Sequence, residues 1–251
     1  MKQILVIGIG AGDPDHITVQ AVKALNRVDV FFVLDKGEVK QDLVDLRQEI
    51  LDRHVDGSYR VVEARDPDRD RSTPAYAEAV HDWRRRRADV CEELIRTELA
   101  EGETGAFLVW GDPALYDSTL AIVEDILARG GVEFDYEVIP GITSVQALVA
   151  KHRTSLNRVG RPVQITTGRR LAEGFPAGVD DVVVMLDAHN SFTGLADEDV
   201  DIYWGAYVGT PDELLISGPV REVAERIVAT RAEARERKGW IMDTYLLRRR
   251  T

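Results

Sequence analysis

The chain has 251 residues, of which 44% are hydrophobic, and its formal net charge is −12 at pH 7. This length is enough for one large or two small domains with a substantial core. The negative charge argues against a nucleic-acid partner, because phosphate binding needs a basic face. Local arginine clusters could still bind a small anion.

Cysteine content and apolar runs limit the class of protein further. Cys91 is the single cysteine, which excludes a disulfide framework and a cysteine-rich metal site within one chain. We interpret it as a core residue of a helix. The chain enters its first strand without a leader-like segment, and no apolar run reaches the ~20 residues that span a bilayer. We therefore expect a cytoplasmic protein with no membrane partner and no metal.

In the first half of the chain, strand-like apolar runs alternate with helical patterns. Strands are expected at 4–7, 28–34, 59–63, 106–110 and 136–139, and helices after Thr18, at 43–51, after Thr73, and from Asp117 or Ser118 to Gly130. The long third helix has Pro74 at its first position and Gly102 just past its end. Residues 64–73 form a charged loop before it.

After Thr143 short strand-like runs dominate. They are 163–166, 182–186, 202–207, 214–217 and 240–247, with helical patterns chiefly at 145–151 and 220–233. This pattern of short strands with few helices predicts a second α+β layer with a mixed sheet. We place the boundary near residues 141–144, which gives an α/β domain at 1–142 and an α+β domain at 143–251.

Three strands of the first half end sharply at glycine or proline. Their end segments are Gly8–Pro14, Gly111–Pro113 and Pro140–Ser144. Buried strands of this kind are typical of a parallel sheet, whose carboxyl ends gather at one edge and bind ligands there. The sequence therefore predicts a small-molecule site.

The first glycine-rich loop fits a dinucleotide fingerprint poorly. Asp13 stands where the fingerprint needs glycine, Pro14 has no N–H to donate, and the helix begins only near Thr18. A pyrophosphate would therefore meet a carboxylate instead of a helix N-terminus. A tight turn that uses glycine for backbone freedom is the alternative.

The segment Gly111–Tyr116 is a more specific signal. Gly111 would let a ligand approach the backbone, and Pro113 keeps Asp112 out of the helical region. Such a loop could offer carbonyls and an N–H to an amino acid or a nucleoside. A structural Asp-Pro turn is the alternative interpretation.

Taken together, these three segments in register resemble the tetrapyrrole (corrin and porphyrin) methylases over almost the whole chain. Within that family, Phe32–Gly37, Asp66–Arg71, Trp110–Ser118 and the long helix at 74–101 resemble a corrin-modifying branch. The resemblance implies a two-domain class III methyltransferase-like fold with a ligand cleft between the domains. It also implies S-adenosyl-L-methionine as methyl donor, S-adenosyl-L-homocysteine as product, a tetrapyrrole substrate and a homodimer.

The resemblance also implies which residues bind the cofactor. They are Ala11, Trp110, Gly111, Asp112, Leu115, Thr143, Ser144, Met185 and Gly209. For Met185 a role in the strand core is an equal alternative. Two residues depart from the family pattern: Ala11 replaces a frequent proline, and Asp243 lies where relatives tend to have glycine.

The branch implied by the resemblance removes an acetyl group as acetic acid after the methyl transfer. Because water must then attack a ketone-like carbon, a general base is expected. By position the candidates are Asp13, Asp35, Asp112 and Tyr116. A turn or capping role is the alternative for each of them.

A tetrapyrrole substrate carries many carboxylates, so arginines in the charged loop are candidates for binding it. These are Arg65, Arg69 and Arg71, and pairing with Asp66, Asp68 and Asp70 at the surface is the alternative. Three other functions stay open at this point. They are methylation of a different target by a related methyltransferase, nicotinamide-dependent oxidoreduction, and ligand binding without catalysis.

Overall fold

A computed structural model describes residues 1–35, 41–68 and 76–250 of the chain. The chain divides into two compact units. Unit 1 comprises Met1–Gly10 and Pro14–Ile142, and unit 2 comprises Ala11–Asp13 and Thr143–Thr251. The first glycine-rich loop therefore contributes a short segment to unit 2, although it lies near the beginning of the chain.

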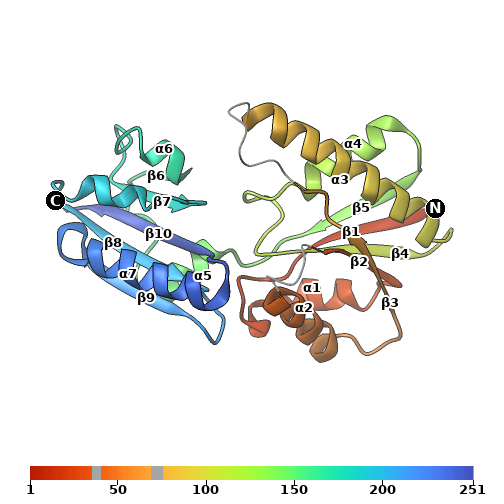
Figure 1. Cartoon of the computed structure of the whole chain (residues 1–251). Coiled ribbons are helices and arrows are strands. Elements are labelled where there is room, and N and C mark those ends of the chain that lie inside the picture. The colour runs from red at the N-terminus through yellow and green to blue at the C-terminus, as the bar shows by residue number, and fades with distance from the viewer. Residues whose placement is uncertain (36–40, 69–75, 251) are drawn as a thin grey trace. The chain divides into compact units, whose positions relative to one another are not determined.

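Unit 1 is an α/β layer structure (Figure 1). Its elements in chain order are β1 (Lys2–Gly8), the 3₁₀ helix η1 (Pro14–His16), α1 (Val19–Leu25), β2 (Val30–Asp35), α2 (Gln41–His54), β3 (Arg60–Arg65), α3 (Tyr76–Glu98), β4 (Thr104–Val109), α4 (Thr119–Arg129) and β5 (Phe134–Ile139). The five strands form one sheet in the order β3-β2-β4-β1-β5, and every pairing is parallel. This confirms the predicted parallel sheet.

The interior strand β1 is apolar from Ile4 to Ile7 because helices cover both faces of the sheet. Ile4 and Val6 pack in one core cluster with residues of α3 and α4. Leu5 and Ile7 point the other way, into a cluster with residues of α1 and α2. Figure 1 shows the two helix pairs on opposite faces.

The strand order creates a switch point beside β1. The chain leaves β1 through α1 toward β2 on one side, and it leaves β4 through α4 toward β5 on the other side. The loops after β1 and β4 therefore lead to helices on opposite faces of the sheet. Open α/β sheets bind ligands at such a point.

Unit 2 is built on a mixed sheet. Its elements in chain order are α5 (Ser144–Lys151), β6 (Val163–Thr167), α6 (Gly168–Leu171), β7 (Asp181–Met185), the 3₁₀ helix η3 (Ser191–Leu195), β8 (Val200–Ala206), β9 (Leu214–Pro219), α7 (Val220–Lys238) and β10 (Asp243–Arg249). The order is β6-β7-β10-β8-β9, with β6 parallel to β7 and the other pairings antiparallel. Helix α5 contacts β10 and β8, whereas α7 contacts β9, β8 and η3. The predicted mixed sheet is confirmed.

Most expected elements lie where the sequence places them, and the differences are local. The three short helices η1, α6 and η3 were not predicted, since each is too short to show a periodic pattern. The last strand begins at Asp243 instead of 240, because Gly239 in left-handed conformation ends α7 and the chain must then turn. The expected start of the long helix at Thr73 and Pro74 lies outside the described residues.

No helix among the described residues combines the length and the apolar character that a bilayer crossing needs. Nor do the residues that the structure describes include a group of three or more histidine, cysteine, aspartate or glutamate side chains placed to hold a metal ion.

Candidate functional site

The three loops at the carboxyl edge of unit 1 pack backbone against backbone. Gly111 N donates to Gly10 O at 2.8 Å, and both residues have positive φ, +70° and +84°. A Cβ atom added at Gly8 would lie 2.7 Å from Gly111 O, and one added at Gly141 would lie 2.0 Å from the same oxygen. Glycine is therefore needed here so that the loops can meet.

Asp112 fastens two of these loops together. Its Oδ1 accepts from Ala114 N at 2.7 Å, which makes a local turn, and its Oδ2 accepts from Gly141 N at 2.8 Å. The predicted Asp-Pro turn is thus present. The carboxylate is also half-buried at the edge where a ligand is expected.

The other predicted residues of this loop differ in exposure. Trp110 is half-buried, and in the described part of the chain its buried Nε1 has no hydrogen-bond partner. Leu115 N donates to Asp112 O at 3.2 Å, which keeps the loop compact. Tyr116 is 47% exposed and has a φ of +51°. A non-glycine residue in that region is uncommon and often marks a functional loop.

In unit 2, the predicted cofactor residues gather at one edge of the sheet. Strands β7 and β8 both flank β10 and run in the same direction, with Met185 and Gly205 both in register with Thr244. The loop after β8 contains Gly209, whose φ is +85° and whose N donates to Glu213 Oε2 at 2.8 Å. Met185 and the Gly209 loop therefore lie at the same end of the sheet.

The segment Ala11–Asp13 adjoins that loop. Gly12 has a φ of +145°, and a Cβ atom there would lie 2.7 Å from Thr210 Cγ2 and 2.8 Å from Val208 O. Ala11 is buried, and Asp13 is half-buried. The first glycine-rich loop thus lies against the residues on either side of Gly209, a contact between segments almost two hundred residues apart in the chain.

Thr143 and Ser144 begin helix α5. The Thr143 side chain accepts from Gln146 N at 3.4 Å, and Gln146 Oε1 accepts from Thr143 N at 3.0 Å, which is a capping box. The spacing of threonine and glutamine three residues apart is its usual sequence signal, and it points to a structural role for the Thr143 hydroxyl beside the predicted cofactor role. Ser144 is the first residue of the helix.

This edge has a suitable chemistry for S-adenosylmethionine, which carries an apolar adenine face, ribose hydroxyls and a sulfonium cation. Leu186 follows Met185 with a φ of +55° and is 66% exposed, so an apolar surface is held at the strand end. The Asp13 carboxylate favours a cation over a pyrophosphate. The residues present fit the cofactor that the resemblance implies.

The remaining predicted residues are only partly described. Arg65 is exposed, and its Nη2 lies 3.5 Å from Asp68 Oδ2. Such an exposed pair contributes ~0–1 kcal/mol and leaves the guanidinium accessible. Arg69 and Arg71 lie outside the described residues. Asp35 ends β2 at the same edge as Gly8, but its side chain is outside what the structure describes.

Sequence reasoning missed a buried ion pair beside this edge. Arg87 belongs to the run Arg84–Arg87, and a run of charges on a helix is typical of a solvated face. Its side chain is 11% exposed, and its Nε lies 2.8 Å from Asp66 Oδ1. Arg87 Nη1 also donates to Ser118 Oγ at 3.0 Å, and the guanidinium stacks over the Trp83 ring at 4.7 Å. No local pattern could show this, because the partners are on separate elements.

Comparison with known proteins agrees with this architecture. The family model of the Tetrapyrrole (Corrin/Porphyrin) Methylases matches residues 3–224. The chain is 54% identical over 250 residues to a protein of Sinorhizobium sp described as precorrin-6A synthase (deacetylating), covering 99% of this chain and 96% of the relative.

Solved structures show the same relationship. The cobalamin synthesis related protein CobF of Corynebacterium diphtheriae has a TM-score of 0.84 and 39% identity, covering 99% of this chain and 98% of that one. The fold is shared by a uroporphyrin-III C-methyltransferase of Thermus thermophilus in complex with S-adenosylhomocysteine. That structure has a TM-score of 0.57 and 18% identity, covering 98% of this chain and 91% of that one. The chain belongs to the tetrapyrrole (corrin/porphyrin) methylases.

Proposed function

We propose that this protein is an S-adenosylmethionine-dependent C-methyltransferase that methylates C-1 of precorrin-5 and releases the C-20 acetyl group as acetic acid, giving precorrin-6A. The observation that carries this proposal is the 54% identity to the Sinorhizobium precorrin-6A synthase (deacetylating) over 99% of the chain. The glycine loops at the strand ends support it, because they adjoin the positions that the family uses for the cofactor.

When bound, the cofactor supplies an electrophilic methyl group on a sulfonium, and a carbon of the tetrapyrrole displaces it in line. The protein need not form a covalent bond in this step. Its contribution is to hold the two reactants aligned, which can supply roughly 7–11 kcal/mol of barrier reduction. The hydrogen bond from Gly141 N to Asp112 Oδ2 suits this task, since it fixes the two loops that would border the reactants.

The second step needs water. Water adds to the acetyl carbonyl carbon, the bond from that carbon to the ring carbon that carries it breaks, acetic acid leaves, and the ring carbon keeps the electron pair until the conjugated ring system or a proton takes it up. A general base that removes a proton from the water would speed this addition. We propose that this base is among Asp13, Asp35, Asp112 and Tyr116.

The structure distinguishes these candidates in part. Both carboxylate oxygens of Asp112 already accept backbone N–H groups, so a role in holding the loops fits it better than proton transfer. Tyr116 is exposed and Asp13 is half-buried, and both stand at loop positions close to the expected ligand. We therefore rank Asp13 and Tyr116 first for substitution.

The decisive experiment is incubation with precorrin-5 and a donor labelled in its methyl group, followed by mass spectrometry of the corrin and assay of free acetate. The proposal expects a labelled corrin that has lost its acetyl group. Asp13→Asn or Tyr116→Phe should leave a methylated product that keeps the acetyl group if that residue is the base. Asp15→Asn is the matched control, since its side chain is exposed two residues from Asp13. Loss of both activities together in every variant would place the base elsewhere.

Cofactor class is tested separately by calorimetry with S-adenosylmethionine and with NAD. Only the former should bind. Met185→Ala should weaken its binding several-fold if the side chain touches the cofactor, whereas Val159→Ala, at a fully exposed position, should not. Gly111→Val is a poor test of contact, because its positive φ would strain any β-branched residue.

The proposal includes a cytoplasmic homodimer, as the family resemblance implies. Light scattering coupled to size-exclusion chromatography measures the mass directly. A species of twice 28.0 kDa supports this part of the proposal, and a species of 28.0 kDa at micromolar concentration contradicts it.

A further inference from the structure

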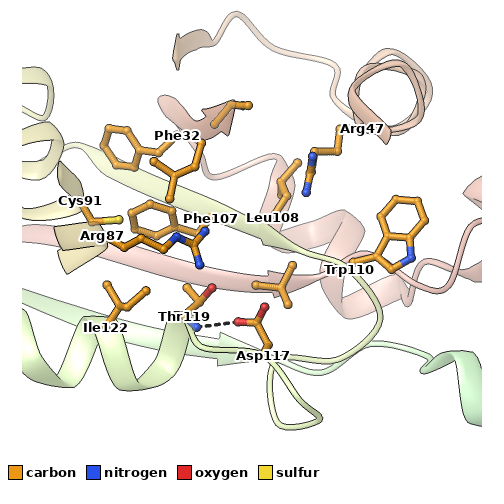
Figure 2. A pocket seen from close by; sticks show the side chains of 13 residues that line it. Phe32, Arg47, Arg87, Cys91, Phe107, Leu108, Trp110, Asp117, Thr119 and Ile122 are labelled. Atoms are coloured by element: carbon orange, nitrogen blue, oxygen red, sulfur yellow. Dashed lines mark hydrogen bonds between the residues drawn. The ribbon is translucent and has the colours of Figure 1, made fainter. Parts of the chain in front are cut away.

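Unit 1 contains a cavity of about 140 Å³ beside the switch point (Figure 2). It lies at the carboxyl ends of β2 and β4, between residues of α2, α3 and the start of α4. Its apolar walls are formed by Phe32, Val33, Leu34, Phe107, Leu108, Val109 and Ile122, and its polar lining comes from Arg47, Arg87, Cys91, Trp110, Asp117 and Thr119. Neither the cofactor positions nor the charged loop accounts for most of these residues.

Two donors in this cavity lack an acceptor among the residues that the structure describes. Arg47 comes from α2, and within the described ranges its guanidinium makes no hydrogen bond and no ion pair. Burial lowers the pKa of Arg47, and the charge of Asp117 partly opposes that effect. The second donor is Trp110, whose buried Nε1 also has no partner among the described residues. Unpaired buried donors cost free energy unless something accepts from them.

The other charged groups of the cavity are already occupied. Arg87 is held by Asp66 and Ser118, as described above. Asp117 is exposed, and its Oδ1 accepts from Thr119 N at 2.6 Å at the beginning of α4. Among the described lining residues, Arg47 is therefore the cation whose charge is neutralised least, and Asp117 is the one carboxylate.

The size and chemistry of the cavity suit a small anionic group on an apolar stem. At about 140 Å³ it is smaller than the ~300–1,000 Å³ pockets that enclose whole drug-sized ligands. The planar fork of a guanidinium matches a carboxylate, and an indole N–H can donate to the same kind of oxygen. Phe32 and Phe107 offer apolar surface to methylene groups.

We propose that this cavity holds one carboxyalkyl arm of the tetrapyrrole substrate, with Arg47 and Trp110 Nε1 donating to its carboxylate. This inference rests on the proposed function for the identity of the substrate class. It assigns to Arg47 a role in substrate specificity, because a corrin arm that is esterified, amidated or absent would leave the half-buried guanidinium unpaired.

Binding is tested with uroporphyrin, a stable tetrapyrrole whose side arms are all acetates and propionates. Arg47→Met should weaken uroporphyrin binding about tenfold or more, the usual effect of removing a charged hydrogen-bond partner, and Arg47→Lys should weaken it less. Arg53→Met is the control on the same helix, since Arg53 is half exposed and pairs with Glu49. Asp117→Asn keeps the acceptor for Thr119 N and removes the competing charge, so it should tighten binding.

A second measurement locates the contact. In ¹H–¹⁵N spectra, the indole signal that disappears in Trp110→Phe should shift when uroporphyrin is added to the wild type. In Arg47→Met that shift should be lost at the same porphyrin concentration. Unchanged affinity in folded Arg47→Met, or an indole signal of Trp110 that does not respond to uroporphyrin, would overturn the inference.

Turnover separates this inference from the proposed function. If the wild type converts precorrin-5, Arg47→Met should raise the KM for it about tenfold while the affinity for S-adenosylmethionine stays unchanged. Conversion with an unchanged KM in that variant refutes the role of Arg47 and leaves the proposed function intact. Failure of the wild type to convert precorrin-5 refutes the proposed function. The uroporphyrin results then test on their own whether Arg47 and Trp110 bind a carboxylate in the cavity.

Discussion

At the scale of single residues, Asp243 shows how one departure from a family pattern is compensated. It stands at the start of β10, at a position where the family resemblance implies glycine. Its Oδ2 accepts from Trp204 Nε1 and from Arg231 Nε, each at 2.9 Å, and the two charged side chains are 6% and 8% exposed. Arg231 Nη2 also donates to Asp187 O at 2.7 Å. A buried carboxylate is tolerated here because a guanidinium and an indole N–H satisfy it.

Removing one partner should therefore be costly. We expect Asp243→Ala to lower the free energy of unfolding by about 3–5 kcal/mol, since it leaves the Arg231 charge buried and unpaired. Asp199→Ala is the control, because Asp199 forms an exposed pair with Arg221 and should cost less than about 1 kcal/mol. Urea titration at neutral pH measures both. A loss of unfolding free energy below about 1 kcal/mol in Asp243→Ala would show that the ion pair of Asp243 with Arg231 does not stabilise the fold.

The buried thiol of Cys91 makes a prediction about alkaline pH. Burial raises the pKa of Cys91 from 9.0 to about 12, with Arg87 lowering it and Asp66 raising it to a smaller extent. A pKa that is higher in the folded than in the unfolded chain means that the stabilising contribution is complete below about pH 9. It is lost as the pH rises toward 12, by about 1.4 kcal/mol per pH unit.

We expect the free energy of unfolding of the wild type to fall more steeply between about pH 9 and 11 than that of Cys91→Ala, with a difference in slope near 1.4 kcal/mol per unit. The comparison of the two proteins cancels other alkaline groups, such as Tyr245, whose pKa burial also raises. Equal slopes would show that the thiol ionises in the folded protein. Slow reaction of the folded protein with a thiol reagent at pH 8 would support the raised pKa of Cys91.

At the scale of elements, the junction of the three glycine-containing loops explains why unit 1 needs glycine at particular positions. A Cβ atom at Gly141 would lie 2.0 Å from a backbone oxygen, which no side-chain rotation can relieve. We expect Gly141→Ala to destabilise the protein by about 2–3 kcal/mol, within the range of overpacked sites. Thermal unfolding compared with Gly57→Ala tests this, because a Cβ atom at Gly57 meets nothing within 4 Å.

Gly57→Ala should be neutral or slightly stabilising, by about 0.4–1 kcal/mol, since it restricts only the unfolded chain. If both variants unfold at the same temperature, the loops of the junction can move apart without cost. That result would also weaken the proposal that Asp112 and Gly141 hold the reactants in a fixed geometry.

Elements whose signals lie close together in the sequence were predictable. The Thr18 side chain caps α1 by accepting from Ala21 N, and Gly130 ends α4 in left-handed conformation. Both features depend on residues within one turn of each other, so the local pattern contains them. The short helix α6 was missed because it is too short to show a periodic pattern, and the late start of β10 was missed because the chain must turn after Gly239 ends α7.

The candidate site was predictable only where a family pattern or a strand end marked it. The position of the Gly111 loop beside the ends of the neighbouring strands follows from the parallel sheet. Arg47 was not singled out, because on the sequence it is an ordinary charged residue of an amphipathic helix. Only the fold shows that its guanidinium lies in a cavity with Trp110. The ion pair of Arg87 with Asp66 was missed for the same reason.

At the scale of the whole molecule, the net charge of −12 opposes the approach of a polycarboxylate substrate. Arginines near the strand ends act over short distances, whereas the overall repulsion acts over the screening length. That length is ~30 Å at 0.01 M and ~10 Å at 0.1 M ionic strength. Added salt should therefore remove more of the repulsion than of the local attraction.

We expect kcat/KM for the tetrapyrrole to rise about two- to tenfold when potassium chloride increases from about 0.01 to 0.1 M, because screening speeds the encounter of like-charged partners. Affinity for S-adenosylhomocysteine, which carries no net charge, should change little and serves as the control. Choline chloride at the same ionic strength should act like potassium chloride if screening is the cause. A fall in kcat/KM with salt would show instead that the arginines dominate the field felt by the approaching substrate, so that the acidic surface has no influence on capture.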